Sequence, residues 1–230
     1  MRNRLYLVLL LLLAAVVLRV RAGDIIDRIV ATVNGHVILL SDWDDAVRFE
    51  AFVENRSLDQ ISDQDRTRAL DQLIDQELVR EQTQANEAPP PAAEEVQKRI
   101  QEIQSQHSAS TPSAWQSALA NYGFDEKHLE ARIAENLVLM RQVEARLRPT
   151  VQIDPASIES YYHDQFLPQL RNTGAQEVPL AQVSSKIREI LTERKLNELF
   201  SSWLQSLRAG SKITSSSASS PSAASGGQGQ

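Results

Sequence analysis

Histidine is the residue type in this sequence that would first suggest metal binding or acid–base catalysis. Helical zinc sites place two histidines on one face, as in His-x-x-x-His or His-Glu-x-x-His, so that both rings reach one ion. The four histidines here are scattered along the chain, and none falls in such a spacing. We therefore predict no metal site and interpret them as surface or capping residues: His36, His107, His128 and His163.

Paired acids are the second candidate for chemistry. Asp44-Asp45 and Glu94-Glu95 are adjacent in the sequence. Neighbouring residues on a helix point in different directions, whereas a pair of catalytic carboxylates must flank one substrate bond. The sequence also lacks Gly-x-Ser-x-Gly, a phosphate-binding glycine loop and a dinucleotide-binding fingerprint. We predict no catalytic residue, no cofactor and no ATP-driven step.

Aromatic side chains are the remaining candidates for a functional surface. Most lie at helical spacing on apolar stripes, where the core is the expected position. Some cannot share one buried stripe, above all Phe52 beside Phe49 and Tyr161 beside Tyr162. Such residues are candidates to line an exposed groove for apolar segments of other polypeptides. The candidate residues are Phe49, Phe52, Trp115, Tyr122, Phe124, Tyr161 and Tyr162.

The charge balance excludes one broad class of function. The 230 residues include 24 Lys+Arg and 30 Asp+Glu, which gives a formal net charge of −6. Nucleic-acid binding depends on Lys and Arg that neutralise phosphates, so we predict no nucleic-acid partner. A hydrophobic fraction of 42% with only 5% aromatic residues and eight glycines favours a mainly helical globular protein over a β-sandwich or barrel.

The N-terminal residues 1–22 have the pattern of a secretory signal. Arg2 and Arg4 precede an unbroken apolar run over residues 5–18. This run is shorter than the roughly 20 residues that span a bilayer as a helix. We predict cleavage after Ala22 and no stable membrane insertion afterwards, although Arg19 and Arg21 leave a retained anchor open. The chain has no cysteine, so neither a disulfide nor a lipid-modified cysteine can support the exported domain.

A β-hairpin is predicted directly after this segment. Two apolar, β-branched runs at residues 29–33 and 36–40 flank Asn34-Gly35. That dipeptide adopts positive φ easily and suits a two-residue type I′ turn. An isolated hairpin is marginally stable in water, so its apolar face must pack on helices or pair with a further strand.

Apolar residues at helical spacing predict helices over most of the remaining chain. One helix begins at Ser41-Asp42, and a second begins at the Ser62-x-x-Asp65 cap and carries the stripe Leu70, Leu73, Ile74 and Leu78. Pro89-Pro90-Pro91 then interrupts the chain. Further helices are predicted around Val96–Ile103, from Thr111-Pro112 to Gly123, from the Asp125 cap to Pro149, and from Asp154-Pro155 past Phe166.

The C-terminal region is predicted to hold one long helix and a tail. The helix runs over residues 179–210, which is about 45 Å at 1.5 Å per residue. Residues 211–214 could add a third strand. The Ser-, Ala- and Gly-rich residues 215–230 cannot bury enough apolar surface to fold, so we expect a disordered tail.

Two segments of the sequence resemble a known family. Residues 26–43, IDRIVATVNGHVILLSDW, and residues 70–78, LDQLIDQEL, are similar to the start and the second helix of SurA-type periplasmic chaperones. The resemblance continues more weakly to about Tyr162 and again over residues 186–213. It implies a single helical chaperone core over residues 23–210, in which the N-terminal segment 23–170 is joined by the returning C-terminal helix 179–210.

The same resemblance implies that an isomerase domain is missing here. Members of the family insert a parvulin-type prolyl isomerase domain before the final helix. Here only residues 163–178 lie at that place, whereas an independently folded domain needs at least about 50 residues. We therefore expect the chaperone core without isomerase activity.

The resemblance implies a periplasmic, ATP-independent chaperone, or holdase. Its partners would be unfolded exported polypeptides, above all precursors of outer-membrane β-barrels. Two alternatives stay open. The protein could be an isomerase-related folding factor with residual or lost activity. It could also be a module that binds one fixed partner or forms a homodimer through its long C-terminal helix.

Overall fold

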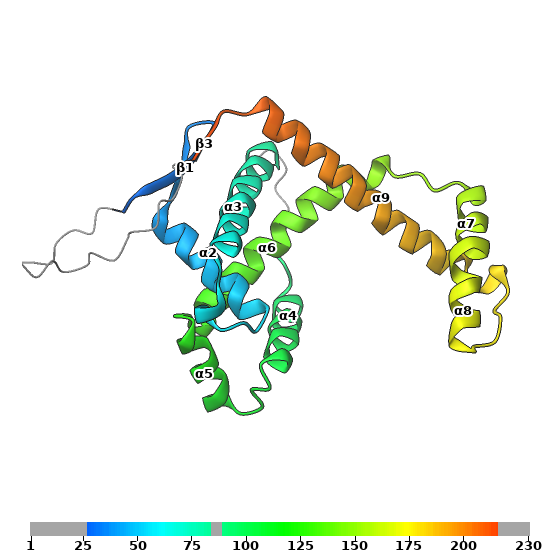
Figure 1. The fold of residues 1–230 in the computed structure, drawn as a ribbon, viewed down its shortest axis with the longest axis horizontal. Coiled ribbons are helices and arrows are strands. Elements are labelled where there is room, and N and C mark those ends of the chain that lie inside the picture. The colour runs from blue at the N-terminus through cyan, green and yellow to red at the C-terminus, as the bar shows by residue number, and fades with distance from the viewer. Residues whose placement is uncertain (1–26, 84–88, 216–230) are drawn as a thin grey trace, which may run out of the picture.

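The computed structural model describes residues 27–83 and 89–215, and these residues form a mainly helical fold with one small sheet (Figure 1). The predicted signal at residues 1–22 and the predicted tail from residue 216 onward lie outside the described residues. The elements in chain order are β1 (Ile29–Val33), β2 (His36–Leu39), α2 (Leu40–Val53), η1 (Leu58–Gln60), α3 (Asp63–Thr83), α4 (Ala93–Gln106), α5 (Pro112–Asn121), α6 (Glu126–Leu147), η2 (Arg148–Thr150), α7 (Pro155–Tyr161), η3 (Tyr162–Phe166), α8 (Leu167–Thr173), α9 (Leu180–Gly210) and β3 (Ile213–Ser215).

The predicted hairpin is confirmed, and the C-terminal strand completes a three-stranded sheet. Asn34 and Gly35 have φ values of 51° and 99°, as a type I′ turn requires at both central positions. The strand order is β2-β1-β3, and both pairings are antiparallel. Ser215, which was expected in the tail, is the last residue of β3. The two ends of the described chain are thus joined in one sheet.

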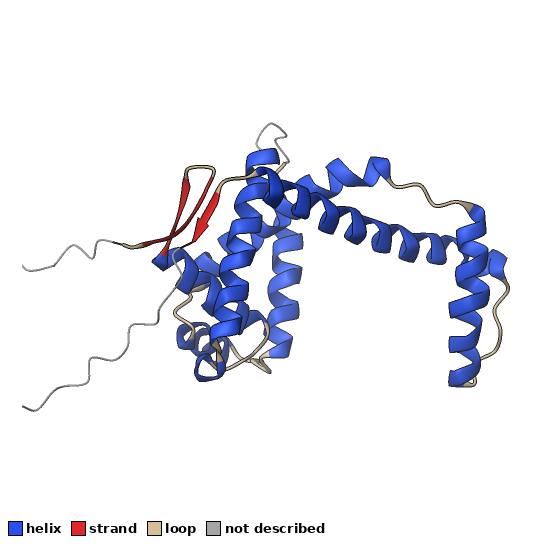
Figure 2. Ribbon diagram, turned by 45° about the horizontal axis from the view of Figure 1, so that its top comes forward, coloured by secondary structure: helices blue, strands red, loops and turns tan. Residues whose placement is uncertain are grey.

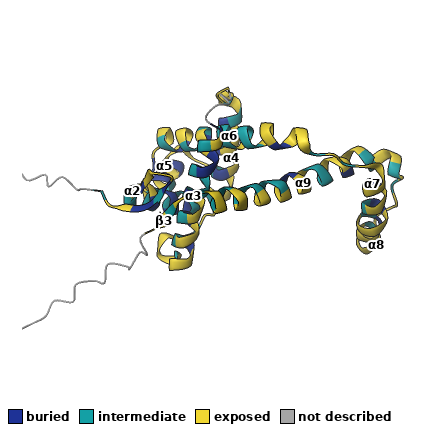
Figure 3. Cartoon of the chain, turned by 90° about the horizontal axis from the view of Figure 1, so that it is seen from above, coloured by how far each residue is buried: buried dark blue, intermediate teal, exposed yellow. Residues whose placement is uncertain are grey.

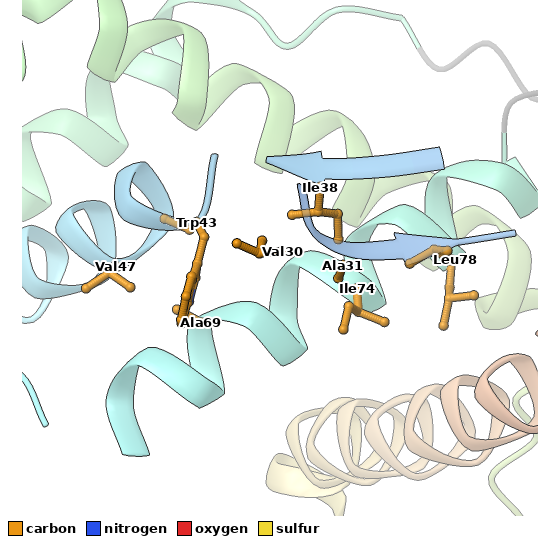
Figure 4. Packing of buried hydrophobic residues seen from close by; sticks show 10 residues of the cluster. Val30, Ala31, Ile38, Trp43, Val47, Ala69, Ile74 and Leu78 are labelled. Atoms are coloured by element: carbon orange, nitrogen blue, oxygen red, sulfur yellow. The ribbon is translucent and has the colours of Figure 1, made fainter. Parts of the chain in front are cut away.

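One face of this sheet packs on α2 and α3 (Figure 4). The hairpin contributes Val30 and Ile38 to the contact, and α3 contributes Ile74 and Leu78. Trp43 of α2 lies in the same cluster, and its indole Nε1 donates a 2.7 Å hydrogen bond to the carbonyl oxygen of Arg66. This packing supplies the helical support that an isolated hairpin lacks.

The predicted cap of α3 is a reciprocal capping box. The backbone N–H of Ser62 donates to Asp65 at 2.9 Å, and the backbone N–H of Asp65 donates to the Ser62 hydroxyl oxygen at 3.2 Å. Arg56 and Arg68 also contact the Asp65 carboxylate, at 3.2 and 2.6 Å. Hydrogen bonds from the side chain and backbone of Ser62, followed by the one from Arg56, hold the pKa of Asp65 well below its usual value.

The start of α2 differs slightly from the prediction. The helix begins at Leu40, so Ser41 and Asp42 lie in its first turn. Asp42 still closes that turn, because its carboxylate accepts a 3.0 Å hydrogen bond from the backbone N–H of Leu39. The Ser41 hydroxyl instead donates to Asp27 and lowers the pKa of that carboxyl group.

A second hydrophobic cluster joins the end of α2 to α4, α5 and α6. The predicted caps of α5 and α6 are confirmed. The side chain of Thr111 accepts a hydrogen bond from the N–H of Ala114, and that of Asp125 accepts one from the N–H of His128. We call the sheet and helices α2 to α6 the body. The buried residues of its second cluster are Phe52, Val96, Ile100, Ile103, Ala109, Trp115, Leu119, Phe124, Leu129 and Ile133.

The long helix α9 joins the body to a separate group of helices that we call the arm, formed by α7, η3 and α8 (Figures 1 and 2). The two buried residues of α9 are Ile187 and Leu196. They are nine residues apart, which is about two and a half turns, so they lie on opposite sides of the helix. The N-terminal half packs on the arm through Ile187, whereas Leu207 near the C-terminal end packs on the first cluster of the body.

Polar contacts fix the C-terminal half of α9 on the body. Arg208 binds Asp75 of α3 at 2.6 Å and also contacts Asp71. The guanidinium of Arg146 lies 5.0 Å from the ring centroid of Trp203. The remaining surface of α9 is largely exposed or half-buried (Figure 3). Helix α9 therefore connects the arm to the body, and only its C-terminal half packs on the body.

Between residues 27 and 83 and between residues 89 and 215, no helix combines the length and the apolar character needed to cross a bilayer.

Candidate functional site

The candidate aromatic residues of the body form an internal cluster around Phe52. Phe52 is fully buried. Its ring stacks on His107 with centroids 4.4 Å apart and lies 5.3 Å from the ring of Tyr122. The rings of Trp115 and Phe124 also contact Phe52, with centroid distances of 5.7 and 5.9 Å from its ring. These rings attach α2 to the helices α4, α5 and α6.

Hydrogen bonds at the edge of this cluster show the same structural role. The His107 ring nitrogen Nε2 lies 2.7 Å from the carbonyl oxygen of Phe52. The Tyr122 hydroxyl donates to the carbonyl oxygen of Arg56 at 2.9 Å. The expectation that Phe52 is exposed is therefore wrong, because α5 and the loop before α6 fold over the end of α2 and cover it. Trp115 and Phe124 belong to this cover, and each is only 5% exposed.

Phe49 and the aromatic residues of the arm have mixed positions. Tyr162 is buried, and its hydroxyl donates to the carbonyl oxygen of Val178 at 2.8 Å, so the expectation that it is exposed is also wrong. Tyr161 is half-buried below the guanidinium of Arg194, 5.0 Å from its ring centroid. Phe49 is half-buried beside Arg132 in the same way, at 5.1 Å. Client binding by these residues stays a prediction.

Three of the seven candidate aromatic residues border hollows on the surface. Trp115 borders a groove between α4, α5 and α6, Tyr122 borders a hollow beside η1, and Tyr161 borders one between α7 and α9. These three hollows are separate, and each is lined by residues from different elements. The structure therefore does not unite the seven residues in one groove.

The groove between α4, α5 and α6, which we call the glutamine groove, has a volume of about 360 Å³. Its apolar part is formed by Ile100, Trp115 and Leu129, and its polar part includes a row of glutamines on α4. The complete lining is Gln97, Ile100, Gln101, Gln104, Ser110, Pro112, Trp115, Glu126, Leu129 and Glu130.

The spacing of the glutamines places them along one side of α4. Gln97, Gln101 and Gln104 follow each other at i, i+4 and i+7, which is the spacing of one helix face. Gln97 donates to Glu130 at 3.0 Å, and Gln104 donates to the carbonyl oxygen of Ala109 at 3.0 Å. Gln101 is exposed between them. This spacing is visible in the sequence, but glutamine is neither aromatic nor ionisable and was not among the predicted site residues.

The chemistry of the glutamine groove is binding chemistry. A glutamine amide offers both a donor and an acceptor, so it can pair with the backbone of any peptide whatever its side chains. The apolar residues beside it are largely buried and offer a narrow apolar edge to the side chains of such a peptide. Glu126 and Glu130 give the groove a negative charge that disfavours acidic segments.

The connection between α7 and α9 is the place where the resemblance to SurA-type chaperones implies an inserted isomerase domain. The residues between α7 and α9 form only η3, the short helix α8 and a connection that begins at Gly174. Gly174 ends α8 with a φ of 69°, the left-handed conformation that glycine adopts without steric cost. Among the described residues, those between α7 and α9 therefore form no parvulin-type domain.

Comparison with known proteins identifies the family. A search among curated proteins found no match. The family model of the SurA-like N-terminal domain matches residues 1–143, which is more than half of the chain and includes the hairpin and the helices α2 to α5 with most of α6. The chain therefore belongs to the family of SurA-like N-terminal domains, which gives it a chaperone-related role.

Proposed function

We propose that this protein is an exported, ATP-independent holdase that binds unfolded polypeptides in the periplasm, with outer-membrane β-barrel precursors as the main clients. The observation that carries the proposal is the glutamine groove on a body of the SurA-like family. Its mixture of amide and apolar side chains suits many extended peptides and selects no single sequence. The signal-like residues 1–22 support export.

The mechanism is binding by mass action. A protein that binds the unfolded chain, and not the native one, lowers the free concentration of the species that aggregates. Contacts that are weak and spread over several places keep dissociation fast, so the client can be released without ATP. The arm and the body, held apart by α9, offer such separate places, including the hollow beside Tyr161.

Light scattering tests the holdase proposal. An outer-membrane β-barrel protein is diluted from urea into buffer with and without the purified protein. We expect near-stoichiometric amounts to suppress the rise in scattering, because each bound client is removed from the aggregating pool. A folded preparation that leaves the scattering unchanged would exclude general holdase activity and favour binding of one dedicated partner.

A substitution in the glutamine groove tests its location. We expect Gln101→Trp to raise the dissociation constant for unfolded clients at least about tenfold, which corresponds to about 1.4 kcal/mol. The indole ring would fill the groove, and Gln101 is exposed, so the fold has room for it. Fluorescence titration with a labelled unfolded client measures the change.

The matched control for this variant is Gln72→Trp. Gln72 is an exposed glutamine on α3 and is absent from the lining of the glutamine groove. Circular dichroism should give the same melting temperature for both variants. Equal client affinity in the two would place the binding surface elsewhere on the molecule.

A further inference from the structure

One side chain of the hairpin meets two side chains of α3 beside the hairpin turn. His36 is the first residue of β2, and Glu77 and Glu81 lie one turn apart on α3. His36 Nδ1 is 3.5 Å from Glu77 Oε1, and His36 Nε2 is 3.9 Å from Glu81 Oε1. One ligand atom from each residue lies within 4.8 Å of the others. Helical histidine spacing cannot reveal such a cluster, because its ligands come from a strand and a helix, so the prediction of no metal site did not take it into account.

The second oxygen of each carboxylate is already held by a neighbour. Glu77 Oε2 accepts a 2.6 Å hydrogen bond from Arg80, and Glu81 Oε2 accepts a 2.7 Å hydrogen bond from Asn34. The two Oε1 atoms are the ones that face His36. Residues outside the ligand set thus orient both carboxylates, which is the arrangement found around metal ligands in proteins.

One of the two Oε1 atoms that face His36 has no hydrogen-bond donor within reach among the described residues. Glu81 Oε1 is buried from solvent and, among the residues that the structure describes, receives no hydrogen bond. The Glu81 side chain is only 15% exposed, and that of Glu77 is 12% exposed. A buried carboxylate oxygen without a donor costs free energy, and a cation placed beside it would remove that cost. His36 is 58% exposed, so its ring can turn toward a shared ion.

We propose that His36, Glu77 and Glu81 bind one divalent transition-metal ion of the Zn²⁺ type. An imidazole nitrogen and two carboxylate oxygens form a mixed donor set that suits Zn²⁺, whereas Mg²⁺ and Ca²⁺ prefer oxygen ligands alone. Zinc bonds of about 2.0–2.2 Å place ligand atoms about 3.4 Å apart. The three ligand atoms lie within 4.8 Å of one another, so they reach that spacing through small rotations of the His36 ring and the two glutamate side chains. Water completes the coordination.

The bound ion would be a clamp between the hairpin and α3. Asn34, which orients Glu81, also accepts a 2.8 Å hydrogen bond from the backbone N–H of Lys212 and contacts Ser211 at 3.2 Å. The site therefore lies where the hairpin, α3 and the segment between α9 and β3 meet. Metal binding there stabilises the contact that joins the two ends of the described chain.

Thermal unfolding with and without metal tests this proposal. The protein is purified without a histidine tag, treated with a chelator, and melted with added Zn²⁺ or Mg²⁺. At a Zn²⁺ concentration 100 times the dissociation constant, we expect the melting temperature to rise by about 5 to 10 °C. Mg²⁺ should leave it unchanged. Added Co²⁺ should give a visible absorption spectrum that Zn²⁺ abolishes by competition.

Variants assign the effect to the three residues. His36→Gln and Glu81→Gln should each lose most of the Zn²⁺-dependent rise and the Co²⁺ spectrum. His163→Gln, which removes an exposed histidine on the arm, should retain both. The proposal is overturned if the parent protein shows neither effect, or if His36→Gln responds to Zn²⁺ as strongly as the parent does.

Discussion

Replacing Phe52 with alanine is expected to lower the free energy of unfolding by about 3–5 kcal/mol. Phe52 is fully buried, and its ring contacts four others, so the variant leaves a cavity that His107, Trp115, Tyr122 and Phe124 cannot fill. Urea denaturation followed by tryptophan fluorescence measures the change, since Trp115 lies in the same cluster.

Two further substitutions separate a core role of Phe52 from direct client contact. Phe49→Ala should cost only about 1–2 kcal/mol, because Phe49 is half-buried. Phe52→Leu should keep most of the stability and all of the suppression of client aggregation. If Phe52→Leu stayed fully folded and yet no longer suppressed aggregation, Phe52 would be part of the client surface after all.

The variant Ile187→Asp is expected to unfold the arm and leave the body folded. Ile187 is 1% exposed and packs with Ile158, Tyr162 and Leu167. A carboxylate among these apolar side chains has no partner and costs several kcal/mol. Hydrogen exchange should therefore speed up about 100-fold or more in residues 155–173. Amides in α3 and α6 should keep their protection, because Leu207 and Arg208 hold the C-terminal half of α9 on the body.

The control for this variant is Ser185→Asp, two residues earlier and exposed. It adds the same charge to α9 and should leave exchange in the arm unchanged. A loss of protection in α3 and α6 together with the arm would show that body and arm unfold as one unit, contrary to their separate hydrophobic clusters.

Client suppression by Ile187→Asp would also locate the binding surfaces. If the arm contributes one of several weak contacts, the variant should suppress aggregation less well than the parent at equal concentration. The glutamine groove lies on the body, so part of the activity should remain.

Local signals in the sequence predicted the elements well. Asn34-Gly35 requires positive φ, and Ser62-x-x-Asp65 satisfies backbone donors within one turn, so both act over three or four residues. The apolar stripe of α3 and the caps at Thr111 and Asp125 are confirmed for the same reason. Such turns, caps and stripes depend on neighbouring residues in the chain, so they can be predicted without knowledge of the tertiary structure.

The exposure of the aromatic residues could not be predicted from such local signals. Phe52 and Phe49 are on one helix, three residues apart, yet one is fully buried and the other half-buried. The difference arises because α4 to α6 return and cover the end of α2. No helical stripe indicates which of its members a distant helix will cover.

The sequence by itself determined the hairpin, the helices with their caps and the membership of a chaperone-related family, because these follow from local backbone preferences and contiguous motifs. Only the tertiary structure decided that α9 bridges two packed groups, that the glutamines of α4 border a groove, and that His36 meets Glu77 and Glu81. Each of these depends on side chains from elements distant in sequence, and their approach is set by burial of apolar surface across the whole fold.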